Sequence, residues 1–182
     1  MEVFAFLKKL CYTTCVTLLH YFMRELSEVI KEKKVTKTKI LKHYNFPKNS
    51  RAVILNLISD ENLKNFVTNA CEEIGVAVID SLETFDKDLI IGADAIVSEK
   101  IEKDSEFDEI LQAAVTPIFP IESEYDLEEF NPMKFEGNAF LFKENKPFQI
   151  FEKICRMLEN LNYAGDRRML IKNLLEFSVN QK

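Results

Sequence analysis

Four cysteines and two histidines are the side chains of this sequence best suited to metal binding or nucleophilic chemistry. They are Cys11, Cys15, Cys71, Cys155, His20 and His43. No two cysteines form a CxxC pair, and no zinc-site spacing joins a cysteine to a histidine. We therefore expect free thiols in a reducing compartment, no metal site and no cofactor. Cys11 and Cys15 lie four residues apart on an expected helix and are interpreted as small core residues.

Two further chemically active side chains, Asp60 and Glu61, follow an apolar run at the point where a buried strand would end. The surrounding segment, Arg51 to Asp80, contains two continuous apolar runs separated by residues with helical periodicity. Such runs are typical of strands covered on both faces, and a helix between them makes the strands parallel. The segment predicts a βαβ unit and therefore a single α/β domain, Rossmann-like and layered, with a mostly parallel sheet.

Shorter signals predict the remaining elements. We expect strands at Ala95 to Val97, in TPIFPI (116–121) and in GNAFLF (137–142). Two prolines in TPIFPI lack an amide donor, so that strand should be short. Helices are expected at 147–161, where a proline suits the first turn, and at about 167–177. No helix is predicted between residues 80 and 95 or between residues 100 and 115.

The N-terminal sequence predicts two amphipathic helices, over residues 3–34 and over Thr36 to Tyr44. Thr36 would be the N-cap of the second helix, and Asn45 suits the left-handed residue that ends it. A secretory signal is the alternative for the first helix, but threonines and His20 interrupt the apolar run and no small-residue cleavage site follows. We therefore expect a helical extension at 1–34 and one domain at 35–182.

The charge balance narrows the classes of partner. The chain carries 24 Lys and Arg residues against 30 Asp and Glu residues, a formal net charge of -6. An acidic chain is poorly suited to bind nucleic acid or an anionic membrane surface. The apolar part of the N-terminal segment is also too short and too polar to span a bilayer. These properties predict a cytoplasmic protein.

Six segments, in the correct order, resemble the C-terminal, nucleotide-sugar-binding domain of bacterial glycogen synthases and plant starch synthases. TKTKILKHYNFP (36–47) is similar to the family's NKxxLxxxxGLP, and VILNLISDENLKNF (53–66) to VVSRLxxQKGxxLL. DKDLIIGADAIVSE (86–99) resembles LAxxIYAGADxxLMPS, and TPIFPI stands where the family has GTxPIV. EGNAFLF (136–142) resembles GTGFxF, and DRRMLIKNLLEFS (166–178) resembles the closing WxxLxxNAMxxDFSW. The resemblance implies a shortened copy of this domain.

The residues that the family's chemistry needs are replaced. In the family an arginine, and a lysine five residues later, stabilise the charge that develops on the leaving diphosphate. Asn56 stands at the arginine position, Glu61 at the lysine position and Asn62 at the following glycine. The sugar-binding loop falls at Glu102 or Asp104 without the family's Pro-Cys-Gly, and Gly137 is a further sugar-loop position. The sequence also contains no counterpart of the family's acceptor-binding domain.

We therefore assign no catalytic residue. An active form would be a hexosyltransferase that uses a nucleoside-diphosphate glucose. The same residues also have structural interpretations, because Asp60 and Glu61 would interact favourably with the N-terminal end of a helix dipole. Gly92 and Gly137 would serve tight turns or close packing, since glycine has no Cβ.

Three functional hypotheses follow. The first is a non-catalytic relative of the synthases, a binding or interaction module whose N-terminal helix contacts a protein partner or a second copy. The second is a nucleotide-sugar-binding half of a glucosyltransferase that another chain completes, with weak nucleotide-sugar binding. The third is a pseudo-receiver signalling domain, with Asp60 and Glu61 as the acidic pair and Asp94 as phosphoacceptor. Asp94 lies close to Asp60 in sequence, and no strand-end Ser/Thr and Lys set follows it.

Overall fold

Five short strands form one sheet in the computed structural model, which describes residues 26–80, 86–100 and 105–180. The strands are β1 (Val53–Asn56), β2 (Ala77–Ile79), β3 (Ala95–Val97), β4 (Thr116–Pro120) and β5 (Phe140–Phe142). Their order is β2-β1-β3-β4-β5, and every neighbouring pair is parallel. The predicted α/β layered fold is confirmed, with a sheet that is parallel throughout.

The strands are buried on both faces, which explains why their sequences are apolar runs without alternation. In the centre of the sheet, Ile54 pairs with Val78 of β2 and with Ala95 of β3. Every residue of β1, β2 and β3 is buried. The strand with the two prolines is short, as predicted, and ends at Pro120.

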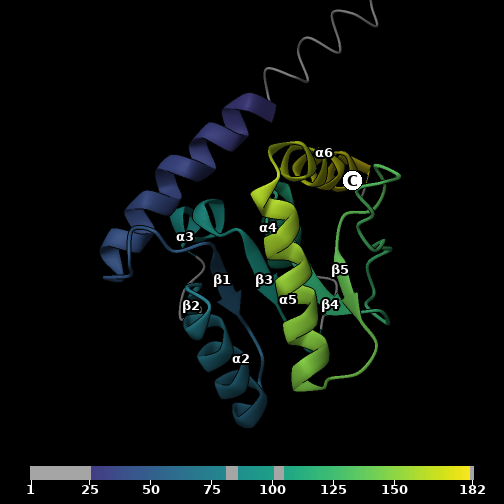
Figure 1. Cartoon of the computed structure of the whole chain (residues 1–182). Coiled ribbons are helices and arrows are strands. Elements are labelled where there is room, and N and C mark those ends of the chain that lie inside the picture. Colours follow the sequence, from purple (N-terminus) through teal and green to yellow (C-terminus); the bar gives the residue numbers. More distant parts are fainter. Residues whose placement is uncertain (1–25, 81–85, 101–104, 181–182) are drawn as a thin grey trace, which may run out of the picture.

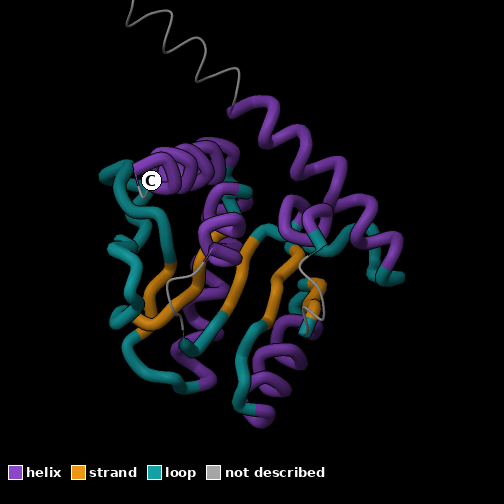
Figure 2. Tube along the Cα trace, turned by 180° about the vertical axis from the view of Figure 1, so that it is seen from behind, coloured by secondary structure: helices purple, strands orange, loops and turns teal. Residues whose placement is uncertain are grey.

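Helices cover both faces of the sheet. They are α2 (Glu61–Glu73), α3 (Lys87–Gly92), α4 (Ser105–Gln112), α5 (Pro147–Asn162) and α6 (Ala164–Asn180). Helices α2 and α5 pack side by side on one face (Figure 1). Right-handed crossovers place α3 and α4 on the opposite side, which the view from behind presents (Figure 2). Helix α6 lies across the end of the sheet at the top of Figure 1 and contacts α4 and α5.

Two of these helices correct the sequence-based prediction. No helix was predicted between residues 80 and 95 or between residues 100 and 115. Helix α3 lies in the first of these segments and α4 lies in the second. The signal in α4 is the spacing of Phe107, Ile110 and Leu111, which are all buried on one side of a helix of only eight residues. So short a helix gives fewer than three turns of periodicity, and its charged first turn resembles a loop.

The N-terminal helix also differs from the prediction. It runs without a break over residues 26–43, so the expected boundary at residue 34 falls inside it and Thr36 is not an N-cap. The segment contains no glycine or proline that would interrupt a helix, and Thr36 is buried within it. The predicted end is confirmed, because Asn45 has a φ of 58°.

This helix is part of the domain rather than an appendage. Leu26, Ile40 and Leu41 belong to the common hydrophobic core. Gly92 at the end of α3 allows the close approach, since a Cβ there would lie 2.9 Å from the Lys37 backbone nitrogen. Close packing at Gly92 is therefore confirmed. Within the described residues, no helix has the length and apolar character needed to cross a membrane.

Candidate functional site

The carboxyl edge of the sheet, meaning the loops that follow the strands, is the place where parallel α/β domains bind ligands. The strand arrows point to this edge at the bottom of Figure 1. The chain leaves β1 for β2 on one side and later adds β3 on the other, so the topological switch point lies between β1 and β3. The loops after Asn56 and Val97 therefore form the first candidate site.

Asn56, the last residue of β1, is fully buried, and its amide is engaged within the protein. Its Nδ2 lies 3.1 Å from Thr68 Oγ1 and 3.1 Å from Asp80 Oδ1, and 3.4 Å from the Lys64 carbonyl oxygen. The Thr68 hydroxyl donates to the same Asp80 oxygen over 2.6 Å. These hydrogen bonds connect the ends of β1 and β2 to α2. They engage the Asn56 side chain, which the resemblance places at the position of the diphosphate-binding arginine.

The first turn of α2 is acidic. Asp60 is its N-cap and accepts a hydrogen bond from the Leu63 amide at 2.8 Å. Glu61 is exposed in the first turn and pairs with Lys64 at 3.1 Å, while Asn62 is exposed beside it. The structural interpretation of Asp60 and Glu61 is thus confirmed, because carboxylates stabilise a helix N-terminus.

A third carboxylate, from the loop after β3, occupies the backbone amides between β1 and α2. Glu99 Oε1 lies 3.0 Å from the Ser59 amide nitrogen and 3.1 Å from that of Asp60. Successive amides at this position are the usual anion-binding groups of nucleotide-binding α/β folds. Glu99 therefore fills, from within the chain, the position that a phosphate group would take. No local pattern in the sequence marks this contact, because Ser59 and Glu99 are 40 residues apart.

An open hollow of about 580 Å³ adjoins these groups. Its lining consists of Asp60, Asn62, Leu63, Phe66, Glu99, Asn145 and Pro147. Among the described residues of this lining, two are carboxylates and none is cationic. A diphosphate 4 Å from one carboxylate would meet a repulsion of about 4 kcal/mol at an effective dielectric constant of ~20. The hollow can accept neutral polar groups, but its charge opposes a diphosphate.

The opposite, amino edge of the sheet carries a second set of charged residues. Asp94 directly precedes β3, and its Oδ2 accepts from Lys37 Nζ at 2.6 Å and from the Val53 amide at 2.9 Å. Asp60 follows β1 and thus lies at the carboxyl edge. The fold separates Asp94 from the acidic pair that the receiver hypothesis requires beside it.

Lys33 joins the N-terminal helix to the ends of two other helices. Its Nζ donates to the Ala93 carbonyl oxygen, at the end of α3, over 2.8 Å. It also donates to the Ala113 carbonyl oxygen, just after α4, over 3.0 Å. A cation at two helix C-termini is favourable. Burial of the ammonium group nevertheless lowers the pKa of Lys33 to about 8, although the residue as a whole is half-buried.

The remaining predicted site residues are not brought together. Gly137 precedes β5 with a φ of 82°, and a Cβ there would lie 2.2 Å from the Glu129 carbonyl oxygen. Gly137 therefore allows close backbone packing, as its structural interpretation predicts, and it lies on the amino side of β5, away from Asn56. Glu102 and Asp104 lie outside the described residues.

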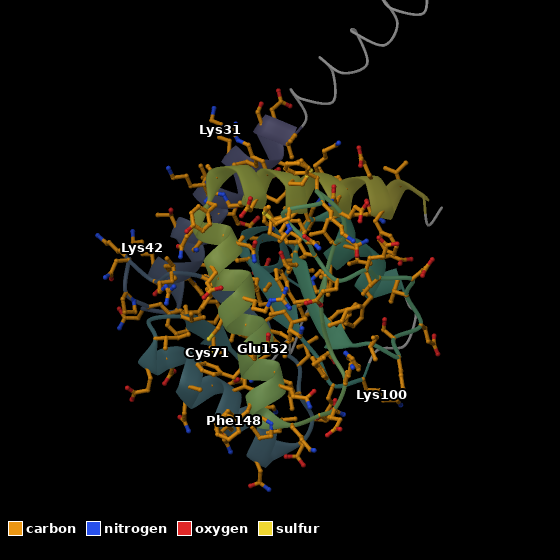
Figure 3. All side chains as sticks on the ribbon, turned by 45° about the vertical axis from the view of Figure 1, so that its right-hand side comes forward. Lys31, Lys42, Cys71, Lys100, Phe148 and Glu152 are labelled. Carbon is orange, nitrogen blue, oxygen red and sulfur yellow. The ribbon has the colours of Figure 1, made fainter. Side chains whose placement is uncertain are left out.

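The cysteines that the structure describes have no metal partners. Cys71 is buried in α2 where that helix packs on α5 (Figure 3), and burial raises its pKa to about 12. Cys155 on α5 also has a raised pKa, chiefly because of burial. In the described ranges, no three His, Cys, Asp or Glu residues are placed to hold a metal ion. Cys11, Cys15 and His20 lie outside those ranges.

Comparison with models of protein families and with curated proteins gave no match for this chain. The resemblance to glycogen and starch synthases therefore depends on the six segments of sequence quoted above. Its consequences for function are proposals.

Proposed function

We propose that this chain is a non-catalytic relative of the nucleotide-sugar-binding domain of glycogen and starch synthases, and that it acts as a binding or interaction module. One observation carries the proposal. The Ser59 and Asp60 amides lie at the switch point, where α/β domains commonly bind phosphate, and they already bind the Glu99 carboxylate at 3.0 and 3.1 Å. A ligand would have to displace a carboxylate of the chain itself.

The strand order supports a nucleotide-binding ancestry. The classic dinucleotide-binding sheet has the order 3-2-1-4-5-6. If strand 3 is removed from the edge of that sheet, the remaining order is 2-1-4-5-6. Renumbered along the chain, this is the order β2-β1-β3-β4-β5 seen here. The loss of one strand and its helix agrees with the shortened interval between the first strand and the segment at 86–99. The same order also occurs in flavodoxin-like domains, so topology alone does not choose between these ancestries.

The chemistry of the carboxyl edge supports the absence of catalysis. Loss of a single group that stabilises developing charge costs about 3–4 kcal/mol of transition-state free energy. Here the arginine position is a buried, internally bonded Asn56, and the lysine position is an exposed carboxylate, Glu61. Two stabilising cations are therefore missing, and one of them is replaced by a repulsive charge.

A nucleotide-sugar-binding half completed by another chain is the second candidate. The hollow of about 580 Å³ at the carboxyl edge favours it, because Asn62 and Asn145 contribute neutral side-chain amides to the lining. Binding would require the Glu99 side chain to leave the two loop amides. A second chain would then have to supply the cations that this chain lacks.

The described part of the N-terminal helix limits the kind of surface that a partner could contact. Most apolar residues of the N-terminal helix in the described ranges, such as Leu26 and Ile40, are buried on the chain's own core, and Val35 is exposed. Its outer side carries exposed charged residues, including Lys31, Lys39 and Lys42. A partner or second copy that contacts this part of the helix would therefore meet a charged surface. Association through an oppositely charged surface of that partner should weaken as salt increases.

Calorimetric titration with ADP-glucose and UDP-glucose tests the proposal. The variant chosen to reopen the site is Glu61→Lys/Glu99→Gln, because Asn56 is fully buried and an arginine there would disrupt the core. Glu72→Gln/Glu73→Lys, at exposed positions near the other end of α2, makes the same change in charge. We expect saturable heat from the first variant alone.

Saturable binding by the wild-type protein would contradict the closed site and favour the second candidate. Absence of binding by Glu61→Lys/Glu99→Gln would contradict the proposal that the carboxyl edge is a closed nucleotide-sugar site. Sedimentation equilibrium at low and high salt tests self-association. A protein that remains monomeric at all concentrations would exclude a second copy as the partner.

A further inference from the structure

The amino edge of the sheet contains a cavity of about 310 Å³ that the proposed function does not use. Its lining comes from the N-terminal helix, the segment before β1, the residue before β3 and the first half of α6. Five cationic side chains line it, namely Lys33, Lys34, Lys37, Lys48 and Arg167. Among the described residues of the lining, Asp94 alone is acidic. The lining is thus strongly positive in a chain whose formal net charge is -6.

Two of the five cations have partners within the protein. Lys33 is bonded to the carbonyl oxygens of Ala93 and Ala113. Lys37 is bonded to Asp94 and to the Arg51 carbonyl oxygen, at 3.2 Å. Asp94 also accepts from a backbone amide, so its charge is already engaged at the wall of the cavity. These contacts hold the wall in place and use the negative charge available there.

The other three cations have no such partner. Within the described ranges, the side chains of Lys34, Lys48 and Arg167 make no hydrogen bond and no ion pair. They come from three separate segments of the chain, the N-terminal helix, the turn before β1 and the first turn of α6. All three residues are exposed, so their side chains lie at the open side of the cavity. A bound anion there would supply the counter-charge that these cations lack among the described residues.

Apolar residues form the rest of the cavity. Ile30 and Leu41 of the N-terminal helix and Ile171 of α6 contribute to its lining. A cavity with a few converging charged groups and an apolar remainder is typical of sites for small organic ligands. Its volume is close to the lower limit for such sites, ~300 Å³, and therefore suits a small molecule better than a nucleotide sugar.

From this arrangement we infer that the cavity binds a small organic phosphate, whose dianionic phosphate group contacts Lys34, Lys48 and Arg167. A phosphate suits this set because the guanidinium binds two of its oxygens at once and the lysines add point charges. The site lies at the opposite edge of the sheet from the closed switch point. It does not depend on descent from a synthase, and either proposal can fail without the other.

Titration with a hexose phosphate, monitored by calorimetry, tests the inference, with the unphosphorylated hexose and inorganic phosphate as comparison ligands. The test variants are Lys34→Gln, Lys48→Gln and Arg167→Gln. The matched control removes two charges from the same helix outside the cavity, Lys31→Gln/Lys42→Gln, whose lysines point into solvent (Figure 3). Thermal unfolding without ligand checks that each variant is folded.

We expect one hexose phosphate per chain, bound more tightly than inorganic phosphate, and no binding of the hexose. Each test variant should weaken binding about tenfold, the effect of losing one charged hydrogen bond. The control pair should bind within about twofold of wild type, because exposed charges outside the cavity are screened. An equal loss in the control pair would overturn the inference, since attraction would then be nonspecific. Absence of saturable binding at 10 mM hexose phosphate, about the limit for a useful small-molecule site, would overturn it as well.

Discussion

Substitution of Gly92 by alanine should push the N-terminal helix away from α3 and destabilise the domain. A Cβ at this position would lie 2.3 Å from Ile40 Cδ1, 2.9 Å from the Lys37 nitrogen and 3.0 Å from the Thr36 carbonyl carbon. The Ile40 methyl group can rotate away, but the other two atoms belong to the helix backbone. The whole helix must therefore shift to admit one methyl group.

The expected magnitude follows from two opposing effects. Overpacking a close contact costs about 1–3 kcal/mol. Alanine is a better helix former than glycine, so the substitution also stabilises the last turn of α3 by about 0.5–1 kcal/mol. We expect Gly92→Ala to lower the free energy of unfolding by about 1–2 kcal/mol.

Urea denaturation followed by circular dichroism measures this change. Gly165→Ala is the control, since no atom lies within 4 Å of the added Cβ in the first turn of α6. The control should be neutral or slightly stabilising. Stability of Gly92→Ala equal to that of the control would refute the close contact between α3 and the N-terminal helix.

Three further predictions concern buried polar and ionisable groups. The pKa of Lys33 is lowered from 10.5 to about 8, so the folded state binds fewer protons than the unfolded state above pH 8, and stability should rise by about 1 kcal/mol between pH 8 and 9. Cys71 and Cys155, whose pKa values are raised, oppose this rise equally in both proteins, so the difference in urea midpoint between wild type and Lys33→Met should grow in favour of wild type from pH 8 to pH 9. Asn56→Asp would place a second carboxylate beside Asp80 in a buried site; we expect a loss of about 2–4 kcal/mol in the same assay, smaller near pH 4, and an unchanged midpoint would contradict the network. Burial raises the pKa of Cys71 to about 12, so wild type and Cys71→Ala should react with a thiol reagent at the same rate when folded and differ by one equivalent only in urea.

Local sequence signals predicted those parts of the fold that depend on neighbouring residues. The βαβ unit, the left-handed Asn45 and the helix that begins at Pro147 follow from apolar runs, backbone preferences and capping. The structure agrees with each of them. By contrast, strand order depends on contacts between distant segments, and the sequence contained no direct evidence for it.

Both charged sites at the edges of the sheet also required the three-dimensional structure. Glu99 meets the Ser59 amide across a separation of 40 residues, so no local spacing marks the contact. The basic cavity combines Lys34 and Lys48 with Arg167, more than 100 residues later. In sequence these residues resemble ordinary exposed charges, and only the fold places them around one cavity.

The closed switch point is the central claim, and the amide signals of Ser59 and Asp60 test it most directly. We would record their ¹H–¹⁵N NMR shifts while titrating UDP-glucose and ADP-glucose into the wild-type protein, with Glu99→Gln as the reference for free amides. We expect that substitution of Glu99 moves both signals and that neither nucleotide sugar does so in wild type. A saturable shift of both wild-type signals with either ligand would show an open phosphate site and contradict the account.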